Sequence, residues 1–106
     1  MVTYEDFQKL DLRVATIKEV NDHPNADRLY VISIDLGDRT KQIVAGIKPS
    51  YLKEDLIGKQ IVVVDNLEPA VLRGVESQAM LLAAQDENGI TAVTLARPVK
   101  NGSIVK

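Results

Sequence analysis

Residues 29–36 read LYVISIDL, a stretch rich in β-branched and other strand-forming side chains. Every second side chain from Tyr30 onward lies on one apolar face, which is typical of a half-buried strand. Gly37-Asp38 then predicts a turn, and Lys41–Ala45 (KQIVA) predicts the next strand. The centre of the fold is therefore expected to be a β-sheet.

The residues before this stretch extend the sheet. Leu12–Val20 predicts the first strand, with one slip in its alternation that a β-bulge explains. Thr3 and Asp6 have the spacing of a capping box and predict a short helix that ends near Asp11. His23–Asp27 (HPNAD) has the composition of a loop.

The residues after it predict a short helix and further strands. Ser50 is the expected N-cap of a helix through Leu56, with Gly58 just past its end. In order, the remaining chain predicts a buried strand at Gln60–Val64, an apolar run at Met80–Ala84 that fits helix or strand, a hairpin turn at Asn88-Gly89 with its second arm at Ile90–Leu95, and a last extended piece at Ile104-Val105.

This order of elements predicts an all-β or mainly β fold, a five-stranded OB-type barrel with short helices and a C-terminal β extension. A doubly wound α/β fold would need longer helices between its strands. With 106 residues, the chain is expected to form one domain over residues 1–106.

Composition narrows the class of protein. The chain is 45% hydrophobic and 26% charged, which is typical of a globular domain and not of disorder. It lacks a signal-peptide pattern, cysteine and any apolar run of the ~18 residues that a membrane helix needs, so we expect a cytoplasmic protein without disulfides. The net charge of −2 disfavours tight, sequence-independent DNA binding but permits a local basic face.

Catalytic patterns are weak. His23 is the one histidine and precedes Pro24 in a loop, where a turn role is commoner than catalysis. Ser77 has no base beside it, no glycine-rich phosphate loop is present, and the acidic residues lack a metal-loop spacing. We expect no catalysis in this chain alone, no metal and no cofactor.

Binding is better supported. An OB barrel binds through its exposed strand face and the loops flanking it, here Asp22–Arg28 and Asn66–Met80. The second loop is long, and long ordered loops are frequently functional. Arg73 suits phosphate, Met80 suits a base plane, and three further residues offer hydrogen bonds: Asn66, Ser77 and Gln78. In the structural alternative Met80 is core, Arg73 pairs with Glu76, and Ser77 satisfies the loop backbone.

Three runs carry a family resemblance: Phe7–Gly37 (FQKLDLRVATIKEVNDHPNADRLYVISIDLG), residues 41–47 (KQIVAGI) and residues 62–84 (VVVDNLEPAVLRGVESQAMLLAA). Together they resemble the tRNA-binding domain appended to methionyl-tRNA synthetases. The same module is similar to free-standing bacterial tRNA-binding proteins and to the C-terminal domain of cytokine-precursor cofactors of eukaryotic synthetases. The resemblance covers Phe7 to Lys106.

The resemblance implies an OB-fold that grips the outer corner of tRNA by shape, with little dependence on sequence, and that forms a homodimer. Ser77 and Met80 match its S-x-x-M element. The full expected tRNA-binding set is Asn25, Arg28, Asn66, Arg73, Ser77, Gln78 and Met80, with diffuse charge from Lys41 or Lys48. The implied partners are tRNA and, in cis or in trans, the catalytic region of a methionyl-tRNA synthetase.

Some positions depart from the family pattern. Glu68 and Val71 stand where family members commonly have lysine, and Ala45 stands where serine is common. Losing two phosphate contacts weakens affinity and flattens its salt dependence. We therefore expect a weak, auxiliary tRNA binder that depends on dimerisation or on an attached catalytic body.

Two other functions remain open. The opening Asp6–Arg13 and the tail Pro98–Gly102 are also similar to the export chaperone CsaA, a protein-binding module that lacks the S-x-x-M element. Alternatively the chain is a dimerisation appendage, with an interface formed by Val99, Ile104 and Val105, although these residues also fit a last strand of the barrel's own extension.

Overall fold

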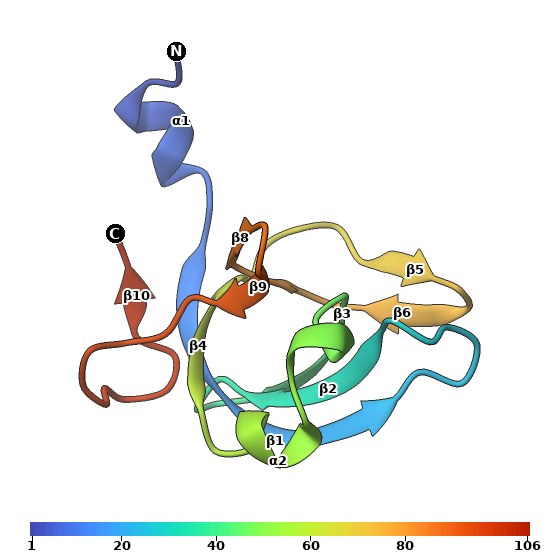
Figure 1. The fold of residues 1–106 in the computed structure, drawn as a ribbon. Helices are drawn as coiled ribbons and strands as arrows, with labels where there is room; N and C mark the ends of the chain where they lie inside the picture. Colours follow the sequence, from blue (N-terminus) through green and yellow to red (C-terminus); the bar gives the residue numbers. More distant parts are fainter.

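The computed structural model describes residues 1–106 and is built around one six-stranded antiparallel sheet with the strand order β3-β2-β1-β4-β7, to which β10 adds by pairing with β1 (Figure 1). Two small hairpins, β5–β6 and β8–β9, stand outside it. The elements are α1 (Tyr4–Gln8), β1 (Leu12–Asp22), β2 (Tyr30–Asp35), β3 (Thr40–Ala45), the 3₁₀ turn η1 (Lys48–Ser50), α2 (Lys53–Leu56), β4 (Gln60–Val64), β5 (Ala70–Leu72), β6 (Val75–Ser77), β7 (Met80–Leu81), β8 (Ala83–Asp86), β9 (Gly89–Ala92) and β10 (Ile104–Val105). The mainly β prediction is confirmed.

The long strand β1 serves both sides of the barrel-like sheet. Its first half pairs with β4 and its second half with β2, and the register shifts between Ile17 and Glu19. The predicted bulge is therefore present, and it supplies the local bend that a curling sheet needs. Ile32 and Ile34, from the alternating face of β2, are fully buried inside the barrel.

The polypeptide closes the barrel between β3 and the segment after β6. The Gln78 backbone N–H donates to the Gln42 carbonyl, and the Gln42 N–H donates to Gln78 Oε1, both at 2.8 Å. Strand edges that find a partner in this way leave fewer unpaired backbone groups.

Three predicted details are wrong. Ser50 does not cap α2, which begins at Lys53 without a side-chain cap; the Ser50 hydroxyl instead accepts from the Ile90 N–H at 3.2 Å. The β8–β9 loop is one residue earlier than predicted, because Asp86 pairs with Gly89, and β9 ends at Ala92 instead of Leu95. The ambiguous run Met80–Ala84 is extended and supplies β7 and the start of β8.

A second apolar cluster lies on the outer face of the sheet. Leu12, Val62 and Val64 are buried there, and the partly buried hydrophobic residues packed against them are Phe7, Leu82, Leu95 and Val105. The N-terminal helix and the C-terminal strand therefore lie on the same side of the molecule, away from the β5–β6 hairpin (Figure 1). None of the helices has the length and apolar character to cross a membrane.

Candidate nucleic-acid interface

The expected long loop after β4 contains a tight hairpin. Leu72 pairs with Val75 across a two-residue turn formed by Arg73 and Gly74, whose φ angles are 53° and 89°. Positive φ at both central residues is the geometry of turns that match strand twist, and glycine adopts it without steric cost. The hairpin therefore presents the Arg73 side chain at its tip.

The β1–β2 loop holds this hairpin from the side. The Asn25 N–H donates to His23 Nδ1 at 2.9 Å, so Nδ1 is the acceptor and the proton is on Nε2. His23 Nε2 then donates to the Leu72 carbonyl at 2.8 Å. His23 is buried in this contact, and its ring joins the two segments that sequence reasoning expected to flank the binding face.

A second pair of contacts joins the loop to the hairpin tip. Asn25 Nδ2 donates to the Arg73 carbonyl at 3.1 Å, and Arg73 Nη2 donates to the Asn25 carbonyl at 3.2 Å. The expected alternative pairing of Arg73 with Glu76 does not occur. Arg73 and Arg28 remain exposed, and neither forms an ion pair. We call the contacts of His23, Asn25, Leu72 and Arg73 the loop–hairpin clamp.

Ser77 and Gln78 have their polar groups committed to the fold. The buried Ser77 hydroxyl accepts from the Val44 N–H at 3.0 Å and donates to the Ala79 carbonyl at 2.9 Å. The Gln78 side chain bonds the Gln42 backbone. For Ser77 the structural alternative is the one observed, because the hydroxyl satisfies backbone groups where the hairpin rejoins β3.

Met80, unlike Ser77, lies at the surface and is free to contact a ligand. The residue is 49% exposed, so the alternative that placed it in the core is wrong. Leu67 and Leu72 are also exposed nearby and, with Met80, line one small hollow. This edge of the barrel is therefore apolar at the base of the hairpin and basic at its tip.

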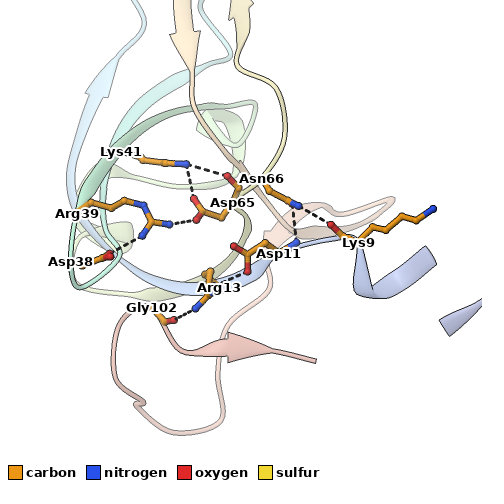
Figure 2. Close-up of polar contacts among 9 residues, drawn as sticks. All are labelled: Lys9, Asp11, Arg13, Asp38, Arg39, Lys41, Asp65, Asn66 and Gly102. Carbon is orange, nitrogen blue, oxygen red and sulfur yellow. Dashed lines mark hydrogen bonds and ion pairs between the residues drawn. The ribbon is translucent and has the colours of Figure 1, made fainter. Parts of the chain in front are cut away.

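Asn66 is part of a latch at the end of β4 (Figure 2). Its Oδ1 accepts from the Asp11 N–H at 2.8 Å, and its Nδ2 donates to the Lys9 carbonyl at 2.7 Å. Both ends of the amide thus hold the segment that follows α1. The side chain expected to contact RNA thus fixes the start of β1.

The neighbouring Asp65 forms the other half of the latch (Figure 2). Its buried carboxylate pairs with Arg39 and lies 2.7 Å from Lys41 Nζ, which also donates to the Asp65 carbonyl at 3.1 Å. Burial lowers the pKa of the Arg39 guanidinium, but the charges of Asp65 and Asp38 outweigh it and leave that pKa raised. Lys41 is therefore engaged in the fold and is not a free contributor of diffuse charge.

Lys48 is engaged as well. Its Nζ lies 3.0 Å from Asp22 Oδ1 and 5.9 Å from the centre of the Tyr30 ring, while Lys53 Nζ lies 3.1 Å from Asp22 Oδ2. Hydrogen bonds from Lys48 and Lys53 hold the pKa of the Asp22 carboxyl below its ordinary value. Of the four expected cations, Arg28 and Arg73 are the two without an acidic partner.

Sequence reasoning missed a polar row across the outward face of the sheet. Glu19 pairs with Ser33, and Ser33 with Gln42, so these side chains are neighbours on β1, β2 and β3. With Asn21 and Gln78, among others, they line an open hollow of about 340 Å³. The sequence did contain a signal for this row. Its residues are the polar positions that lie between the buried apolar positions of the strands. No group of three or more histidine and acidic side chains is placed to hold a metal ion.

Comparison with known proteins identifies the module. Residues 12–104 match the family described as "Putative tRNA binding domain". The chain is 53% identical over 105 residues to the methionine–tRNA ligase of Thermococcus kodakarensis and 51% identical over 105 residues to that of Pyrococcus horikoshii, in each case covering 99% of this chain and 14% of the ligase.

Two solved structures extend the comparison. The methionyl-tRNA synthetase-related protein from Pyrococcus horikoshii is 30% identical with a TM-score of 0.92, covering 100% of this chain and 98% of that one. The CsaA chaperone protein from Picrophilus torridus is 34% identical with a TM-score of 0.94, covering 100% of both chains. The chain thus matches whole small proteins but only a small part of the ligases.

Proposed function

Because the chain belongs to the family of tRNA-binding domains, we propose that residues 1–106 act as one domain that binds tRNA by its shape and not by its base sequence. The family is a tRNA-binding domain, and the chain matches only 14% of the ligases. The chain therefore corresponds to their binding domain and not to their catalytic part. The observation that carries the proposal is the loop–hairpin clamp, which fixes Arg73 at the hairpin tip and carries Arg28 on the adjoining loop.

Charge supports a phosphate-binding role for this edge. The net charge is −2 and several cations are neutralised, yet Arg28 and Arg73 have no acidic partner. A guanidinium presents a planar set of donors that matches phosphate oxygens. Contacts of this kind position a nucleic acid without selecting its sequence.

The remaining expected residues take more limited roles in the proposal. Asn25 and Met80 stay at the surface and contact the RNA beside the two arginines. Asn66, Ser77 and Gln78 act indirectly by holding the latch and the hairpin. Two principal phosphate contacts give a weak site, so binding is auxiliary.

The relatives support a proposal for the setting of the domain. It serves a methionine–tRNA ligase in cis or in trans in the cytoplasm, and it raises tRNA affinity by adding a second site to a larger body. A homodimer formed through the C-terminal strand β10, where Ile104 is exposed, would provide two such sites on one assembly.

The experiment compares several intact tRNAs with an RNA hairpin of equal length, by gel shift at low and moderate salt. Shape recognition predicts similar affinity for all tRNAs, weaker affinity for the hairpin, and loss of binding as salt rises. Strong preference for one tRNA, or equal binding of the hairpin, would contradict it.

A protein-binding module is the second candidate. It is favoured by the similarity to the Picrophilus torridus chaperone and by the exposed apolar side chains of Leu67, Leu72 and Met80. Failure of every tRNA to bind at low salt, with capture of an extended apolar peptide, would favour this function.

A further inference from the structure

A small hollow lies at the base of the β5–β6 hairpin. Its volume is about 150 Å³, Leu67, Leu72 and Met80 lie at its exposed edge, and Val44 and Ala79 lie deeper. Pockets for drug-sized ligands are larger, about 300 Å³ or more. The hollow therefore suits one small, flat, apolar-faced group.

Glu68 is the one residue lining the hollow whose side chain has free hydrogen-bonding capacity. The only other polar side chain lining it is Ser77, whose hydroxyl already bonds Val44 and Ala79. Glu68 is exposed and takes part in none of the ion pairs or side-chain hydrogen bonds of the chain. A carboxylate only accepts, so the group it would bind must bring donors.

The hollow adjoins the loop–hairpin clamp through Leu72. Leu72 lines the hollow, while its carbonyl accepts from His23 in the clamp. A chain of RNA whose phosphates are held by Arg28 and Arg73 is thus within reach of the hollow. The negative charge of Glu68 excludes phosphate from this point, so the nucleotide must enter base first.

We propose that this hollow takes an unpaired guanine base that different tRNAs share, so that the contact adds to recognition by shape without selecting one tRNA. The N1–H and N2–H groups on the Watson–Crick edge of guanine are two parallel donors that match both carboxylate oxygens of Glu68. The apolar side chains of Leu67 and Met80 then cover the ring faces. The inference rests on the proposed function, because it names a part of the RNA that the tRNA-binding edge recognises.

The test follows the Met80 methyl group by NMR during titration with guanosine 5′-monophosphate and with inosine 5′-monophosphate, which lacks the N2 amino group. The chain has two methionines, so the Met80 signal is readily assigned. We expect a saturable shift, with guanosine monophosphate binding about five-fold tighter or more, as a bidentate base contact gives. Glu68→Gln should abolish the difference between the two nucleotides.

A matched control separates this contact from the general effect of charge. Glu76→Gln removes the same charge from the neighbouring strand β6 but does not line the hollow, so it should keep the preference for guanosine monophosphate. Equal affinities for the two nucleotides in the wild type, or equal loss of preference in both variants, would overturn the inference. A Met80 response to an apolar peptide with none to guanosine monophosphate would also overturn it.

Intact tRNA binding, measured on the same three proteins, keeps the two proposals apart. Binding of tRNA without guanine preference at Met80 would refute the base pocket and leave the proposed function standing. Guanine preference without tRNA binding would refute the proposed function and leave the base pocket standing.

Discussion

The buried Ser77 hydroxyl bridges the Val44 N–H and the Ala79 carbonyl, although it lies in the element that suggested RNA contact. We expect Ser77→Ala to lower the free energy of unfolding by about 1–3 kcal/mol, because it leaves a buried N–H without an acceptor. Urea denaturation measures this. Ser33→Ala, on the outward face of β2, should change stability by less than about 0.5 kcal/mol. If Ser77→Ala lowered RNA affinity but left stability unchanged, the result would contradict this role and indicate that Ser77 contacts the RNA directly.

Asp22 lies at the end of β1, where the β1–β2 loop begins, and its carboxyl group is held in ion pairs. Its lowered pKa means that its ion pairs with Lys48 and Lys53 stabilise the fold above the ordinary carboxyl pKa of about 4 and are lost as the pH falls through the lowered value. Asp22→Asn should remove this acid-side dependence and free both lysines. We therefore expect tighter tRNA binding with a steeper salt dependence, measured by fluorescence anisotropy.

The control for Asp22 is Glu87→Gln, which removes an equal charge from the exposed β8–β9 loop. Its effect on RNA affinity should be smaller than that of Asp22→Asn. Equal effects would mean that only the net charge of the chain matters and that Lys48 and Lys53 have no local role.

At the scale of elements, the latch at the end of β4 fixes the β2–β3 turn and the start of β1. The Asp65 side chain is 5% exposed, and its removal would leave Arg39 and Lys41 without their shared partner. We expect Asp65→Ala to cost about 2–3 kcal/mol, below the ~3–5 kcal/mol of a fully buried pair, because both cations are partly hydrated. Thermal unfolding measures the loss.

Asp38→Asn is the matched control for the latch. It removes the other acidic partner of Arg39, but its side chain is 76% exposed, so a change below about 1 kcal/mol is expected. Similar losses in both variants would show that burial at Asp65 contributes nothing beyond an ordinary surface pair.

The elements differ in how much the sequence reveals of them. The strands around Tyr30–Asp35 and Gln60–Val64 were predictable, because alternation and continuous apolar runs record burial locally. Asn66 and Ser50 were not, because their partners lie 57 and 40 positions away along the chain. The sequence identifies such residues as hydrogen-bonding, but only the fold decides whether they bind the chain itself or a ligand.

At the scale of the molecule, the basic hairpin edge and the outer apolar face lie on different sides (Figure 1). Ile104 on β10 is 63% exposed beside that face. If β10 forms the dimer interface, Ile104→Asp should shift sedimentation toward monomer without loss of folding, since the residue contributes little to the core. Val71→Asp, on β5, should leave the dimer intact. A dimer that Ile104→Asp does not weaken would remove the C-terminal strand from the interface.

The central claim is that Arg28 and Arg73, presented by the loop–hairpin clamp, anchor tRNA phosphates. The most direct test measures tRNA affinity against salt for Arg28→Gln/Arg73→Gln and for the control Lys59→Gln/Arg97→Gln, which removes two other cations without ion pairs. We predict that the first variant loses about ten-fold or more in affinity and that its salt dependence flattens by about one to two phosphate contacts, while the control changes little. Equal losses in the two variants, or wild-type affinity in the first, would contradict the account.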